Sequence, residues 1–94
     1  MVFDRLLFRI HAIERMLEHE ITEVDVRDVL ERGEVIEEVR EVDSQMKRLY
    51  LHYVDSRPIH VVAIDDDEMQ YTVIITAYEP DLTRWEQGFR KRKR

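Results

Sequence analysis

Cysteine and asparagine are absent from this 94-residue chain, and glycine and proline occur only twice each. Without cysteine the chain has no disulfide framework and no thiolate chemistry. Two isolated glycines cannot form a glycine-rich phosphate loop. No signal-peptide pattern opens the sequence and no apolar run approaches the ~18 residues of a membrane span. We therefore expect a cytoplasmic protein with no membrane association.

Metal and cofactor motifs are also lacking, so we predict no cofactor and no metal. His52 and His60 would lie on neighbouring strands if the intervening turn forms a hairpin, and two histidines with a carboxylate can bind zinc. No recognised zinc-ligand spacing accompanies them, which favours ordinary strand positions. The acidic run at 65–68 lacks the spacing and the glycine of a calcium loop and indicates a solvated turn.

What the chain does contain is apolar and charged residues, at 44% and 38%. The apolar fraction supports one folded core, and the charged fraction exceeds the usual ~25%. Dense glutamate and arginine without asparagine is typical of heat-adapted proteins. The net charge is −6 even though residues 90–94 are all basic. The body is therefore acidic, which repels phosphate at long range. We expect a single α+β domain over 1–89 and a disordered basic tail over 90–94, which could contact RNA or an acidic partner.

Two amphipathic helices are predicted before residue 33. Apolar residues recur at helical spacing in the first one: Leu6, Ile10, Ile13 and Leu17, with Met16 beside them. This stripe is expected to face the core, and residues 2–9 fit either helix or a short extended lead-in. The second helix, 23–32, begins after Thr22, which with Asp25 resembles a capping box. Its buried stripe is Val26, Val29 and Leu30, and Gly33 is expected to end it as a left-handed C-cap.

Four strands follow, at 34–39, 47–54, 59–64 and 69–78. Short connections between them favour an antiparallel meander. One small layer cannot bury both sheet faces, so we predict two N-terminal helices packed on one face of a four-stranded antiparallel sheet. The last residues, 81–89, are expected to form a short helical turn with Trp85 and Phe89 packing back.

Five segments occur together in a familiar order, at 11–16, 21–26, 33–37, 57–62 and 75–80 (HAIERM, ITEVDV, GEVIE, RPIHVV and ITAYEP). Over His11 to Trp85 the chain resembles the bacterial and archaeal family known as domain of unknown function 4258. That family is similar in layout to the RelE and BrnT toxin ribonucleases, which place helices before an antiparallel sheet. The resemblance implies a toxin-like ribonuclease or RNA-directed protein, with RNA or a cognate antitoxin-like protein as its partner. Two features depart from these toxins: the acidic body, and Tyr78 where BrnT-like proteins tend to carry arginine.

The resemblance also places candidate site residues. A metal-independent ribonuclease needs a base, an acid and a cation for the phosphorane charge. His11 could be the base or acid and Arg15, one helical turn on, the phosphate clamp. Tyr78 or His60 could supply the second proton-transfer group. Further binding residues are predicted at Thr76, Arg48, Arg90 and Lys91.

Two alternatives remain open from sequence. His11 and Arg15 could simply pair with Glu14 and Glu18 on a solvated helix. The protein could also be a non-catalytic interaction module, for example a homodimer formed through the free sheet face or an edge strand. Convergence of His11, Arg15 and Tyr78 in one open cleft would favour catalysis, and their separation would favour the interaction module.

Overall fold

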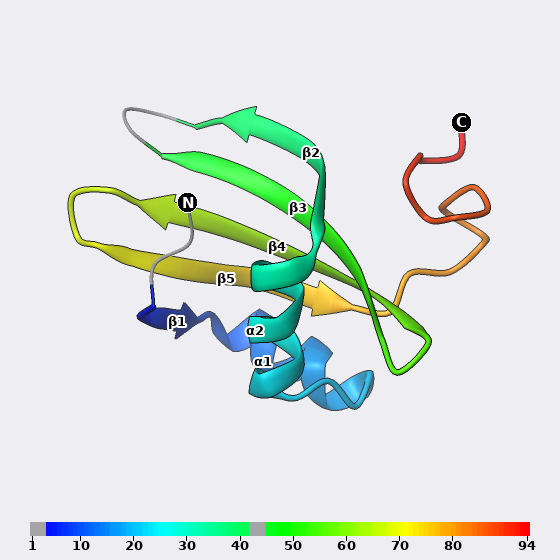
Figure 1. Ribbon diagram of the computed structural model, residues 1–94, viewed down its shortest axis with the longest axis horizontal. Coiled ribbons are helices and arrows are strands. Elements are labelled where there is room, and N and C mark those ends of the chain that lie inside the picture. Colours follow the sequence, from blue (N-terminus) through cyan, green and yellow to red (C-terminus); the bar gives the residue numbers. More distant parts are fainter. Residues whose placement is uncertain (1–3, 42–44) are drawn as a thin grey trace.

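The computed structural model describes residues 4–41 and 45–94 of the chain (Figure 1). It confirms an α+β fold with two helices before an antiparallel meander. The elements in order are β1 (Leu6–Phe8), α1 (Ile10–Glu18), α2 (Glu23–Arg32), β2 (Glu34–Arg40), β3 (Met46–Val54), β4 (Arg57–Asp66) and β5 (Tyr71–Tyr78). None of the helices in the described ranges is long and apolar enough to cross a membrane.

The sheet has five strands in the order β1-β5-β4-β3-β2, and four of them form the expected antiparallel meander. The fifth, β1, pairs in parallel with the start of β5. A purely antiparallel four-stranded sheet was therefore the wrong prediction, and the sheet is mixed. The extended alternative for the N-terminal lead-in is the one adopted. β1 then passes straight into α1, and the Arg9 amide still donates to the Ile74 carbonyl of β5 at 3.1 Å.

The second helix has the predicted bounds and the predicted cap. Thr22 Oγ1 accepts a hydrogen bond from the Asp25 amide at 3.1 Å, and Asp25 Oδ2 accepts one from the Thr22 amide at 3.0 Å. The expected stripe is buried: Val26, Val29 and Leu30. Gly33 does not adopt the left-handed conformation, since its φ is −75°. Glycine is needed there because a Cβ would lie 2.3 Å from the Val29 carbonyl oxygen.

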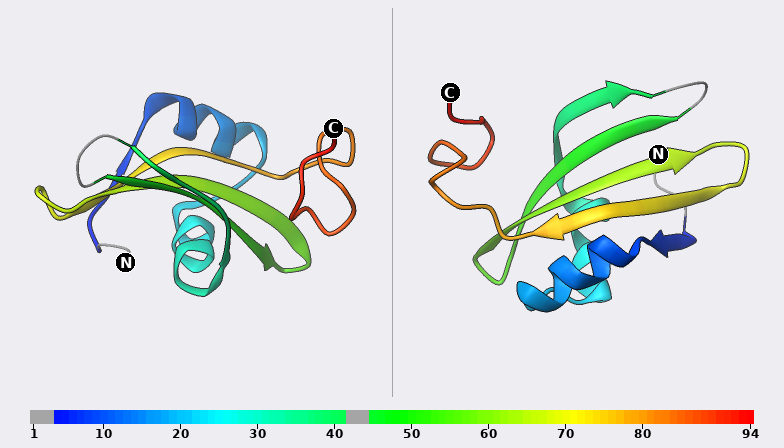
Figure 2. Two further views of the ribbon diagram at one scale, coloured as in Figure 1. Left: turned by 90° about the horizontal axis from the view of Figure 1, so that it is seen from above. Right: turned by 180° about the vertical axis from the view of Figure 1, so that it is seen from behind.

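The first helix buries a different side from the one predicted. Ile10, Ile13 and Leu17 are 77%, 46% and 76% exposed, whereas Ala12 and Met16 are buried. α1 runs beside β5, where the small Ala12 allows a close approach. Figure 2 shows α1 and α2 on opposite sides of the sheet, so the prediction that both helices cover one face was also wrong. The spacing correctly identified an apolar side of α1, but that side faces solvent.

The core joins α1, α2 and the sheet in one cluster. α2 covers the face that carries Tyr50, Ile59 and Val61. Residues 79–94 fold back at the end of the sheet and provide Trp85, which is 2% exposed (Figure 1). Residues 81–89 pack back through Trp85 as expected, but as successive turns instead of a helical turn.

Several of residues 90–94, for which the sequence predicts a disordered tail, make hydrogen bonds to other parts of the chain. Arg92 makes two hydrogen bonds to Glu37, at 2.8 and 3.0 Å, and Arg90 makes one to Glu34 at 2.9 Å. The Lys93 amide donates to a main-chain carbonyl of the preceding turn. Both acceptor glutamates belong to β2, so this last segment ties the end of the chain to an edge strand.

Candidate functional site

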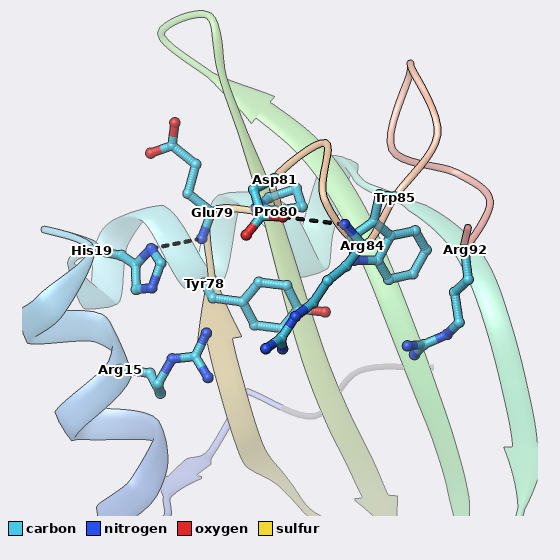
Figure 3. Close-up of a pocket in the computed structure, with 9 residues that line it drawn as sticks. All are labelled: Arg15, His19, Tyr78, Glu79, Pro80, Asp81, Arg84, Trp85 and Arg92. Atoms are coloured by element: carbon cyan, nitrogen blue, oxygen red, sulfur yellow. Dashed lines mark hydrogen bonds between the residues drawn. The ribbon is translucent and has the colours of Figure 1, made fainter. Parts of the chain in front are cut away.

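The most distinctive polar site is a cavity of about 160 Å³ between the end of α1, the end of β5 and the C-terminal segment (Figure 3). We call it the arginine cavity, because three arginines approach it from two parts of the chain. It is lined by Arg15, His19, Tyr78, Glu79, Pro80, Asp81, Arg84, Trp85 and Arg92.

Arg15 enters the cavity from the last turn of α1. Its guanidinium carbon lies 5.1 Å from the centre of the Tyr78 ring, which is a cation–π distance. Its Nε is buried, has no hydrogen-bond partner among the described residues, and is 3.9 Å from the nearest Glu18 oxygen. A buried donor without a partner is uncommon in folded proteins and indicates room for a ligand or water. Arg15 is therefore held in place by a ring but not neutralised at close range.

His19 follows α1 directly and points its ring at the start of the C-terminal segment (Figure 3). Its Nδ1 accepts a hydrogen bond from the Glu79 amide at 3.2 Å. A neutral imidazole that accepts at Nδ1 carries its proton on Nε2. His19 therefore offers a hydrogen-bond donor at Nε2 and does not offer a base there.

Tyr78 is positioned by a buried histidine behind it. His60 is fully buried, its Nε2 lies 2.9 Å from the Phe89 carbonyl oxygen, and its Nδ1 lies 3.2 Å from the Tyr78 hydroxyl. A carbonyl can only accept, so Nε2 carries the proton and Nδ1 accepts from the tyrosine. Burial lowers the pKa of His60, and the hydrogen bond to Phe89 opposes this more weakly. Burial raises the pKa of Tyr78, which stays a neutral phenol.

Two more arginines come from the C-terminal segment. The Arg92 guanidinium stacks 4.7 Å from the centre of the Trp85 ring, and Glu37 holds it by a bidentate pair. Arg84 is exposed, and within the described ranges no carboxylate lies within ion-pairing distance of its guanidinium. In Figure 3 the Arg84 side chain extends past Tyr78 toward Arg15. Arg15 and Arg84 are thus the cations most available to an anion.

The two carboxylates of the cavity are already engaged. Glu79 lies 3.5 Å from Arg57. Asp81 Oδ1 accepts hydrogen bonds from the Thr83 hydroxyl and amide and from the Arg84 amide. The hydrogen bond from the Thr83 hydroxyl is the main cause that lowers the pKa of Asp81. The cavity therefore presents cations and one hydrogen-bond donor, His19, and both of its carboxylates already have partners.

The structure brings only some of the predicted site residues together. Arg15 and Tyr78 meet in the arginine cavity. His60 stands behind Tyr78, where it can position the ring but cannot touch a substrate. His11 is exposed one turn before Arg15 and does not line the cavity. Thr76 lies two residues before Tyr78 on β5, and its buried Oγ1 has no hydrogen-bond partner among the described residues.

Three predicted binding residues lie elsewhere. Arg48 is held by Glu38 at 2.6 Å and by Asp65 at 2.8 Å, which is a structural ion-pair network. Arg90 and Lys91 line a second, more open hollow of about 480 Å³, which we call the C-terminal groove. Arg92 borders both spaces. The other residues of this groove are Ile36, Glu37, Glu86, Lys93 and Arg94.

Sequence reasoning missed His19 and Arg84 as cavity residues. Neither residue belongs to a motif, and the spacing of neither from Tyr78 predicts that the side chains meet. The family resemblance points to Arg15 together with His11 on one helix face, but only tertiary folding brings residues 79–92 to the same place. Asp81, Thr83 and Arg84 form a local turn, and that hydrogen-bonding pattern is the one clue the sequence carried.

Among residues 4–41 and 45–94, no three histidine, aspartate or glutamate side chains lie close enough together to hold a metal ion. His52 and His60 do not meet across the hairpin. His60 pairs with Leu51 and His52 pairs with Ile59, so the two histidines project from opposite faces of the sheet. His52 instead lies 3.6 Å from Asp28 of α2.

Comparison with known proteins gives one match. A family model described as domain of unknown function (DUF4258) matches residues 8–79. The match includes Arg15, His19, Tyr78 and Glu79, and it ends before Arg84. No curated protein and no solved structure matches the chain.

Proposed function

We propose, for a chain that belongs to the DUF4258 family of domains of unknown function, that the arginine cavity binds the phosphate backbone of RNA. The observation that carries this proposal is the convergence of Arg15, Arg84 and Arg92 around Tyr78 in one open hollow. Planar guanidinium groups bind phosphate through paired hydrogen bonds. The Nε of Arg15 has no protein partner among the described residues, and His19 adds a neutral donor.

The charge distribution supports a polymer in preference to a single phosphate. The C-terminal groove continues from the arginine cavity through Arg92 and carries Arg90, Lys91, Lys93 and Arg94. A second phosphate could therefore bind beyond the first. The rest of this acidic chain repels phosphate, which orients an approaching strand toward this end. RNA is proposed before DNA only because the family resembles the RelE and BrnT ribonucleases in its predicted layout.

Binding is better supported than cleavage. A ribonuclease of this kind needs a base for the 2′-hydroxyl. His11 does not line the cavity, His60 is fully buried, and His19 carries its proton on the nitrogen left free. We therefore propose an RNA-directed binding function, and treat cleavage as a separate question for experiment.

The test is fluorescence anisotropy with a labelled 12-nucleotide oligouridylate at 50 and 200 mM salt. We expect Arg15→Gln and Arg84→Gln each to weaken binding about tenfold, and to reduce the salt slope by about 0.7, the value for one single-strand phosphate contact. Arg5→Gln is the matched control, because Arg5 makes a similar cation–π contact, 5.3 Å from the Tyr71 ring at the opposite end of β5.

Equal losses in Arg5→Gln and Arg15→Gln, or no binding by the wild type at 50 mM salt, would refute the proposal. Tighter binding to the matching deoxyoligonucleotide would assign the cavity to DNA. Incubation of the same RNA with the wild type and Tyr78→Phe proteins in EDTA tests for cleavage. A product that forms with the wild type but not with the variant would add catalysis to binding.

The alternative function, a protein-interaction module, is favoured by one independent observation. α1 exposes an apolar stripe that nothing in the described structure covers. This surface does not include the arginine cavity, so the two functions are compatible.

A further inference from the structure

The arginine cavity is small compared with sites that enclose a whole organic ligand. Its volume is about 160 Å³, whereas pockets for drug-sized ligands run from about 300 to 1,000 Å³. A phosphate group fits into this space, but a phosphate with a nucleoside on both sides does not. The volume therefore favours a phosphate that carries a single substituent, as at the end of a chain.

The aromatic rings that line the cavity already have partners. The Arg15 guanidinium lies over the Tyr78 ring at 5.1 Å, and Trp85 is 2% exposed. The Trp85 ring contacts the edge of His60 and the guanidinium of Arg92. Proteins that hold the bases of single-stranded RNA stack them on open aromatic faces. We therefore expect the cavity to contact phosphate and to leave the sugar and base outside.

Three hydrogen-bond donors from different parts of the chain line this one space (Figure 3). Arg15 comes from α1, its side chain is 32% exposed, and its contact with Glu18 is long at 3.9 Å. Arg84 comes from the C-terminal segment, is exposed, and forms no ion pair with a carboxylate of residues 4–41 and 45–94. His19 adds the N–H of its Nε2, because its Nδ1 accepts from the Glu79 amide.

This donor set matches a terminal phosphate better than an internal one. A phosphate monoester has three free oxygens and a charge of about −1.5 to −2 at neutral pH. An internal phosphodiester has only two free oxygens and a single negative charge. Two guanidinium groups without a close carboxylate, together with one neutral donor, therefore match the oxygens and the charge of the monoester.

We infer that the arginine cavity holds the terminal phosphate of an RNA chain and that the C-terminal groove takes the nucleotides next to it. This inference rests on the proposed RNA-binding function. Arg92 borders both spaces, and the groove is larger, at about 480 Å³, with Arg90 and Lys91 among its residues. A 5′ end and a 3′ end can both carry a phosphate monoester, so the experiment compares the two.

The test is competition with the labelled 12-nucleotide oligouridylate at 50 mM salt, with unlabelled hexauridylates as competitors. We expect a hexamer with a 5′- or a 3′-phosphate to compete about tenfold better than the hexamer with neither. The end that gives the stronger competition is the end that the cavity binds. An octauridylate without a terminal phosphate controls for charge, because its two additional phosphodiesters carry about the charge of one monoester. It should compete less well than the preferred phosphorylated hexamer.

Arg84→Gln should reduce the tenfold preference for the phosphorylated hexamer to about twofold or less, because it removes one of the two guanidinium groups that hold the monoester. Lys91→Gln is the matched control, since it removes one positive charge from the groove and none from the cavity. This variant should weaken both hexamers about equally and keep the preference. Arg84 is exposed, and circular dichroism confirms that each variant is folded.

The outcomes separate this inference from the proposed function. If the 12-nucleotide RNA does not bind at all, the proposed function fails and the inference fails with it. If that RNA binds but neither phosphorylated hexamer competes better than the octamer, only the inference is overturned. Competition by uridine 5′-monophosphate as strong as that of the phosphorylated hexamers would assign the cavity to free nucleotides and would also overturn it. Equal loss of the preference in Arg84→Gln and Lys91→Gln would have the same consequence.

Discussion

His60 makes the stability of this domain depend on pH in a definite direction. The side chain is fully buried between Tyr78 and the Phe89 carbonyl, and it lies edge-on to Trp85, with 4.4 Å between ring centres. Burial is the main cause that lowers its pKa below the ordinary value of 6.5. The unfolded chain therefore takes up the proton first as pH falls. The contribution of His60 is complete above about pH 6.5 and is lost as pH falls below it.

The size of this loss follows from linkage. Each pH unit below 6.5 over which folded His60 stays unprotonated lowers the free energy of unfolding by up to about 1.4 kcal/mol. That change is a substantial part of the 5–15 kcal/mol typical of small domains. With a urea m-value of about 1–1.5 kcal/mol/M, the midpoint should fall by roughly 1 M between pH 7.5 and 5.5.

The assay is urea unfolding followed by tryptophan fluorescence, since Trp85 lies against His60. His60→Gln should remove most of the pH dependence over this window, and His11→Asn, a change at an exposed histidine, should leave it intact. If His60→Gln does not fold, an NMR titration of the wild type provides the same information. A His60 resonance that titrates at pH 6.5 or above would refute the reasoning.

Two local features also give measurable effects. Gly33→Ala should destabilise the fold by about 2 kcal/mol in urea unfolding, because its Cβ would meet the Val29 carbonyl at 2.3 Å and force the backbone to shift. A loss below about 0.5 kcal/mol would show that the start of β2 can shift at little cost, contrary to this prediction. Thr22→Ala should cost about 1 kcal/mol, since it removes the cap of the Asp25 amide, while Thr22→Ser should retain most of that stability.

The parts of the fold that depend on residues close together in the sequence were predictable. The second helix was placed correctly because Thr22 and Asp25 cap it locally, and its buried side follows from Val26, Val29 and Leu30. The four antiparallel strands follow from alternation and short turns. β1 was not predictable as a strand because three residues carry little signal and their partner, at 72–74, lies more than sixty residues away.

The first helix shows where periodicity stops being informative. The spacing of Ile10, Ile13 and Leu17 identifies an apolar side but does not reveal what covers it. Ala12, with its small side chain, decides the packing because it permits contact with β5. The same limit applies to the arginine cavity: Arg15 and Tyr78 were found through the family resemblance, whereas Arg84 reaches them only after the C-terminal segment folds back.

The family model covers only some of the residues that line the arginine cavity. Arg15 and Tyr78 belong to residues 8–79, while Arg84 and Arg92 come after them. A chain cut after Glu79 would keep every family element, yet it would lose two guanidinium groups and uncover His60. Under the proposed function, two of the three guanidinium groups that contact phosphate therefore lie outside the family region, and exchanging residues 80–94 offers a route to new specificity on an unchanged scaffold.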